Sequence, residues 1–80
     1  MYFHQAISKR ILELCNKYNY TPNKLAELSA IAPSTLNDVI NDKVDKPNTY
    51  IIYRICKTLN IELKDFFDSE LFKIEFDDWY

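Results

Sequence analysis

The chain has 80 residues, a net charge of −2, and a hydrophobic content of 48% that includes twelve aromatic residues. This length supports one folded domain with a modest core, and the hydrophobic content excludes an intrinsically disordered chain. Because the chain contains no glycine, it cannot form a glycine-rich loop of the kind that cradles phosphates.

The cysteine and histidine content argues against a disulfide framework, a metal site and an active site. Cys15 and Cys56 have no histidine or further cysteine at metal-ligand spacing, so we expect small core residues in a reduced, cytoplasmic protein. The only histidine, His4, has no nucleophile or second base arranged around it. Nothing resembles a leader or a membrane span of about 18 apolar residues. We therefore predict no enzyme, no cofactor and no membrane association.

The negative charge is concentrated at the C-terminal end. Residues 1–67 contain nine Lys or Arg and seven Asp or Glu, giving +2, whereas residues 68–80 contain one Lys and five Asp or Glu, giving −4. We accordingly divide the chain into a domain at residues 1–67 and an acidic, aromatic tail at residues 68–80.

The first predicted helix covers residues 2–18, where Ile7, Ile11, Leu14 and Tyr18 recur at helical spacing. Asparagine adopts the left-handed conformation more readily than most residues. We expect it to end three of the predicted helices, at Asn19, Asn41 and Asn60.

The next two predicted helices are joined by a very short connection. Thr21 and Pro22 suit the cap and first position of a helix that ends near Ser29, and Pro33 suits the first position of the following one. Only residues 30–32 separate them, and we expect Ile31 to enter the core. Two short helices joined so tightly are typical of a helix-turn-helix.

The helix at residues 33–41 has two different faces. Leu36, Val39 and Ile40 fall on one side, and Ser34, Asn37, Asp38 and Asn41 fall on the other at i, i+3, i+4 and i+7. One face is therefore expected to pack and the other to contact a ligand. Asparagine can pair with adenine and aspartate can accept from cytosine, so we predict contacts with bases in the major groove of DNA.

A polar loop at residues 42–48 precedes a further helix, which Asn48 or Thr49 can cap and Asn60 ends. Residues 61–67 form one or two closing turns, with Phe66 and Phe67 sealing the bundle. The predicted fold class is all-α, a five-helix bundle containing a helix-turn-helix.

The tail has the pattern of a strand, because apolar and charged residues alternate over residues 72–77. Three arrangements of the tail are open: it pairs with a second copy of the chain, packs on its own domain, or is mobile. In each, Trp79 and Tyr80 would form an exposed aromatic end. If the tail forms a dimer contact, its apolar residues carry it: Leu71, Phe72, Ile74 and Phe76.

Three stretches together resemble the Cro and repressor (XRE) family of helix-turn-helix proteins over about residues 6–67. They are Leu25-Ala26 in the second helix, Ser34-Thr35-Leu36 in the third, and the closing residues 59–67. The resemblance implies a transcription regulator of a bacterium or phage that binds double-stranded DNA, usually as a homodimer. The family often has glycine where this chain has Ala30 and Asp42, and glutamine where it has Pro22.

The resemblance also assigns DNA-contacting positions. Bases would be contacted by Pro33, Ser34, Asn37 and Asp38, and phosphates by Asn23, Lys24, Lys43, Lys46 and Asn48. The alternative hypothesis is a protein-interaction module, such as an antitoxin-like component, that keeps the bundle without a DNA role and engages a protein partner through its tail.

Overall fold

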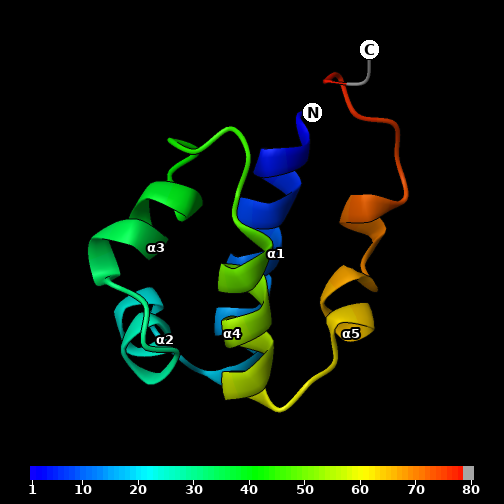
Figure 1. Cartoon of the computed structure of the whole chain (residues 1–80). Coiled ribbons are helices and arrows are strands. Elements are labelled where there is room, and N and C mark those ends of the chain that lie inside the picture. Colours follow the sequence, from blue (N-terminus) through cyan, green and yellow to red (C-terminus); the bar gives the residue numbers. More distant parts are fainter. Residues whose placement is uncertain (79–80) are drawn as a thin grey trace.

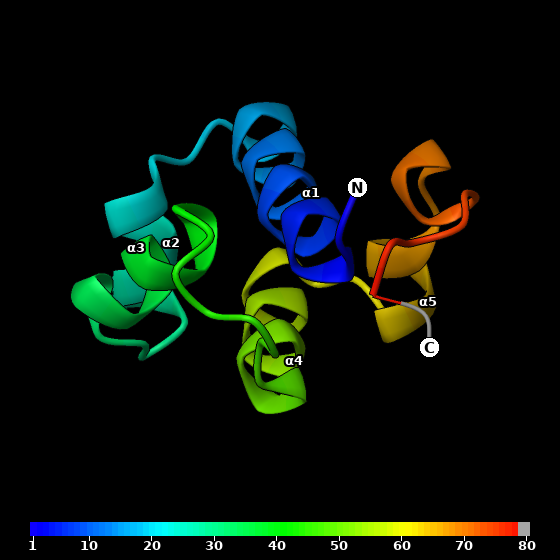
Figure 2. The ribbon, with the colours of Figure 1, turned by 90° about the horizontal axis from the view of Figure 1, so that it is seen from above.

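The computed structural model describes residues 1–78 and has an all-α architecture, as predicted. Two central helices, α1 and α4, separate a side formed by α2 and α3 from a side formed by α5 and the tail (Figures 1 and 2). The elements are α1 (Phe3–Tyr18), α2 (Pro22–Leu28), α3 (Pro33–Ile40), α4 (Thr49–Leu59), α5 (Leu63–Phe67) and a single 3₁₀ turn (Glu70–Phe72).

The core is built from the apolar face that each helix was predicted to bury. Its completely buried members come from all five helices, which explains why short helices are stable here although they would not persist alone. The large side chains among them are Ile7, Ile11, Leu25, Leu36, Ile55 and Phe66. Phe67, expected to seal the bundle beside Phe66, is instead 37% exposed.

The C-terminal ends of α1 to α4 share one geometry. In four places a residue with positive φ is followed by a residue whose amide donates to the carbonyl five positions earlier, as in Tyr20 N to Cys15 O at 2.9 Å. Asn19 and Asn60 adopt this conformation, as predicted, with φ of 61° and 57°. Helix α3 ends at Asn41, as predicted, but Asn41 does not adopt the predicted conformation: its φ is −91°, and Asp42 takes the left-handed position, because Lys43 N closes the bond to Asp38 O.

The fourth position is Ala30, with φ of 55°, in the turn between α2 and α3. An L-residue with a Cβ pays about 1–2 kcal/mol for this conformation, and glycine does not. After allowing for the greater freedom of glycine in the unfolded chain, Ala30→Gly is expected to raise the free energy of unfolding by about 0.5–1 kcal/mol. Urea denaturation followed by circular dichroism measures it.

The matched control is Lys9→Gly, at an exposed position in the middle of α1. There the backbone is helical, so glycine is expected to lower the free energy of unfolding by about 1 kcal/mol. A loss of stability in both variants would contradict the strain assigned to Ala30.

The tail does not form the strand that its alternating pattern predicted, in the part of it that the structure describes. After the 3₁₀ turn the segment bends back over the start of α1, where the Phe72 and Phe76 rings lie 6.1 and 5.4 Å from the Phe3 ring. A single strand would leave its backbone unpaired, whereas this path buries aromatic surface. Packing on its own domain is thus the observed outcome, and the division at residue 67 stays a prediction; Trp79 and Tyr80 lie outside the described residues.

Candidate nucleic-acid interface

The helix-turn-helix is held by local caps and by one buried side chain in its turn. Thr21 caps α2 by accepting from Lys24 N at 3.1 Å, and Pro22 occupies the first helical position. Ile31 is only 8% exposed and packs in the core, as predicted. The turn therefore fixes α2 and α3 side by side (Figure 1).

The two faces of α3 are arranged as the sequence suggested. Leu36 is fully buried and Val39 nearly so, while Ser34 and Asp38 are exposed and Asn37 is half-buried. Pro33 is exposed at the start of the helix. Within the described residues, the side chains of this polar row form no hydrogen bond with the protein. Their donors and acceptors are free to bind a ligand.

The residues assigned to phosphate contacts lie in two places. Asn23 and Lys24 are exposed in the first turn of α2, where Lys24 Nζ lies 3.8 Å from Glu27 Oε2. Lys43 and Lys46 are exposed in the loop between α3 and α4. The start of α2 lies on the same side of the molecule as α3, and the loop runs from the end of α3 to the start of α4 (Figures 1 and 2).

Two of the loop residues have further neighbours. Asn48 uses its side-chain oxygen to cap α4, accepting from Tyr50 N at 2.7 Å, which leaves its amide NH₂ for other contacts. Lys46 lines a hollow of about 420 Å³ together with Asp45 and Asp78, which lower the positive potential around it.

The tail residues proposed for a dimer contact lie away from this surface. Leu71, Phe72 and Phe76 are half-buried on the α1 and α5 side, opposite to α3 (Figures 1 and 2). Ile74, with 48% of its side chain exposed, is the member most accessible to a partner.

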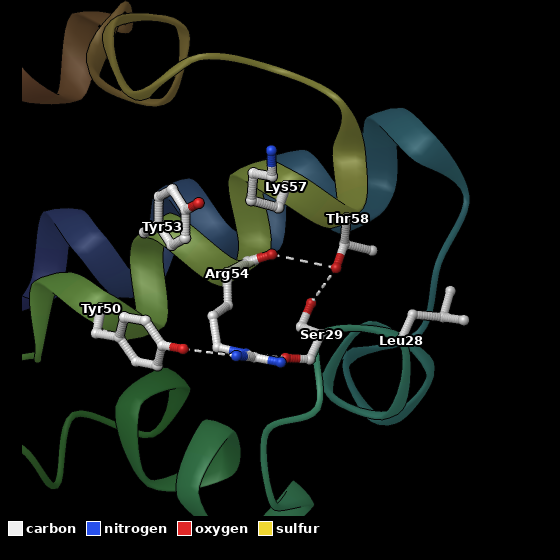
Figure 3. A pocket seen from close by; sticks show the side chains of 7 residues that line it. All are labelled: Leu28, Ser29, Tyr50, Tyr53, Arg54, Lys57 and Thr58. Atoms are coloured by element: carbon white, nitrogen blue, oxygen red, sulfur yellow. Dashed lines mark hydrogen bonds between the residues drawn. The ribbon is translucent and has the colours of Figure 1, made fainter.

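The sequence reasoning missed a second polar cluster, between α4 and the end of α2. It surrounds a hollow of about 450 Å³, lined by Leu28, Ser29, Tyr50, Tyr53, Arg54, Lys57 and Thr58 (Figure 3). The signal in the sequence was weak: Arg54 and Thr58 are one turn apart beside the apolar face of α4, where solvent exposure would be the ordinary expectation.

Other chemistries find little support in the described part of the chain. Burial raises the pKa of the Cys15 and Cys56 thiols, which keeps them protonated and unreactive. No group of three or more His, Cys, Asp or Glu among residues 1–78 is arranged to hold a metal ion. Within the same residues, no helix has the length and apolar character needed to cross a membrane.

Comparison with known families agrees with this geometry. The sequence model of the Cro/C1-type HTH DNA-binding domain matches residues 10–71, which include all five helices except the first part of α1. Searches of curated proteins and of solved structures gave no match. Since the matched region covers most of the chain, and its helix-turn-helix is formed as described above, the chain belongs to the Cro/C1-type HTH DNA-binding family.

Proposed function

We propose that this protein is a sequence-specific transcription regulator that inserts α3 into the major groove of double-stranded DNA. The observation that carries this proposal is the outer row of α3, whose polar side chains form no hydrogen bond within residues 1–78 while the opposite face packs in the core. An α-helix fits the major groove, where each base pair presents its own pattern of donors and acceptors.

The chemistry of this row suggests which bases it contacts. Asn37 can pair with adenine through N6 and N7, Asp38 can accept from the N4 amino group of cytosine, and Ser34 suits several bases. Pro33 supplies an apolar neighbour. Because α3 carries no lysine or arginine, we do not expect the strong guanine contact that arginine makes.

Phosphate contacts would fix the position of α3 without reading sequence. We propose that Asn23 and Lys24 provide them at α2, and that Lys43, Lys46 and the Asn48 amide provide them in the loop. All five residues are exposed.

We also propose that the protein acts in the cytoplasm as a homodimer, because one small module gives limited specificity and paired half-sites lie about one helical turn apart. A contact through Leu71, Phe72, Ile74 and Phe76 would involve mainly Ile74, since the other three pack on their own domain. As the tail lies opposite α3, such a contact would place the two α3 helices at the outer ends of the pair.

A second candidate function is a protein-interaction module that engages a partner through the tail. It is favoured by the single charge on α3, the carboxylate of Asp38, and by the acidity of residues 68–80. The two candidates differ in their response to salt, because binding to DNA releases counterions.

The test is binding to random-sequence duplex DNA over a range of salt concentrations. The wild-type protein is expected to bind in a salt-dependent manner. The double variant Lys43→Ala/Lys46→Ala is expected to bind more weakly, with the slope of log K against log salt reduced by about 2, or about 1 for each lost phosphate contact. Fluorescence anisotropy of a labelled duplex gives both quantities.

Lys64→Ala/Lys73→Ala is the matched control. It removes the same charge from the α5 and tail side, where both lysines are exposed and lie beside glutamates. We expect its slope to equal that of the wild type. Absence of any salt-dependent binding by the wild type would favour the protein-interaction module instead.

A further inference from the structure

We infer that Arg54 and Thr58 of α4 are positioning residues for DNA recognition, which hold the turn between α2 and α3 and so set the orientation in which α3 presents its polar row. This inference rests on the proposed function. It concerns residues of the hollow in Figure 3, outside the surface assigned to DNA.

The turn is attached to α4 through both polar groups of Ser29, the residue that follows α2 and is only 3% exposed. Its backbone carbonyl accepts a hydrogen bond from Arg54 Nε at 2.6 Å. Its hydroxyl lies 2.6 Å from the hydroxyl of Thr58, which also donates to Arg54 O at 3.2 Å (Figure 3). A buried carbonyl that loses its donor is costly, so this bond holds the turn firmly in place.

Arg54 is itself held in one orientation. Its Nη1 donates to the Tyr50 hydroxyl at 2.7 Å, and the guanidinium carbon lies 5.4 Å from the centre of the Tyr50 ring. Tyr53 stacks beside Tyr50 with ring centres 6.0 Å apart. Lysine has neither the planar fork nor the two fixed donor directions, so it cannot reproduce this arrangement.

The turn is where the orientation of α3 is decided. Ala30, directly after Ser29, has the left-handed conformation, and α3 begins three residues later at Pro33. The other end of α3 is also held by a buried polar residue, because Ser8 of α1 donates to Ile40 O at 2.5 Å. Hydrogen bonds thus tie the turn before α3 to α4 and the last residue of α3 to α1.

Base recognition is sensitive to small displacements. Side chains that pair with base edges need positions accurate to about 0.5 Å and angles to about 10–20°. A change in the turn therefore affects discrimination between sequences, whereas nonspecific attraction to phosphates depends mainly on charge.

The experiment compares Arg54→Lys with Lys57→Arg, two exchanges between basic residues that line the same hollow on the same helix. Two duplexes are used: one selected from a random pool by the wild-type protein, and one of random sequence. The ratio of their dissociation constants is measured below the unfolding temperature. Arg54→Lys is expected to lower this ratio tenfold or more, with an unchanged salt slope, and Lys57→Arg is expected to leave both unchanged.

These readouts separate positioning from other roles. Partial unfolding lowers the apparent affinity for both duplexes equally, so it cannot change the ratio. A phosphate contact by Arg54 would instead appear in Arg54→Lys as weaker binding to both duplexes with an altered salt slope. The inference is overturned if Arg54→Lys leaves the ratio of dissociation constants unchanged, or if it weakens binding to both duplexes and alters the salt slope. Thr58→Val, which removes only the hydroxyl, serves if Arg54→Lys does not fold, and is expected to lower the ratio as well.

If the proposed function is wrong, the wild-type protein will bind the selected and the random-sequence duplex equally well, and this result is recognised separately. Whether Arg54 holds the turn is then tested by amide hydrogen exchange at Ala30 and Ile31, whose N–H groups donate to Glu27 O and Ala26 O. Faster exchange in Arg54→Lys than in Lys57→Arg supports attachment of the turn by Arg54. Equal exchange overturns it.

Discussion

Leu36→Ala is expected to lower the free energy of unfolding by about 2–5 kcal/mol, the range for deleting a buried leucine side chain. Leu36 is fully buried and, together with Val39, packs α3 into the core shared with α1 and α2. Domains of this size have little stability to spare, so the variant is expected to be largely unfolded or close to it at 37 °C. Urea denaturation followed by circular dichroism measures the change.

Asn37→Ala, at the next residue of α3, is the matched control. Its side chain forms no hydrogen bond within the described residues and lies on the outer face, so stability is expected to change by no more than about 0.5 kcal/mol. If Asn37 contacts a base, the same variant loses preference at one position of the DNA site, worth about 1–3 kcal/mol. Equal losses of stability in the two variants would mean that the faces of α3 are reversed.

Phe66→Ala is expected to lower the free energy of unfolding by about 3–5 kcal/mol. The ring is fully buried and lies 5.0 Å from the Phe67 ring and 6.3 Å from the Phe72 ring, measured between centroids. It joins α5 and the tail to the core. Its removal leaves a cavity beneath both, because the backbone of α5 is still held by hydrogen bonds from Arg10 to Asp65 O and Phe66 O.

Phe67→Ala provides the comparison, since it removes the same ring from the neighbouring residue, where 37% of the side chain is exposed. Its effect is expected to be clearly smaller, at about 1–2 kcal/mol, in proportion to the area it buries. Thermal unfolding of both variants, with the wild type as reference, checks the order. A larger loss for Phe67→Ala would contradict the assignment of Phe66 as the core residue of α5.

The position of each helix end depends on more than residue type. Asparagine at residues 19 and 60 signalled the left-handed conformation correctly, but after α3 that conformation falls on Asp42. Asparagine and aspartate both tolerate the left-handed conformation. Asp42 adopts it, and not Asn41, because the next amide, that of Lys43, donates to the carbonyl five positions earlier, Asp38 O. Composition alone does not contain this information.

The sequence by itself determined five helices, their buried faces and the helix-turn-helix, because helical periodicity and caps involve residues only a few positions apart. It also identified the polar row of α3, which follows from the same periodicity. Tertiary structure alone decided the path of the tail, which packs on α1 although its alternating apolar and charged residues had indicated a strand. It also decided the hydrogen bond between Ser29 and Arg54, which lie 25 residues apart in the sequence. Such contacts depend on how the helices pack against one another, which no local pattern specifies.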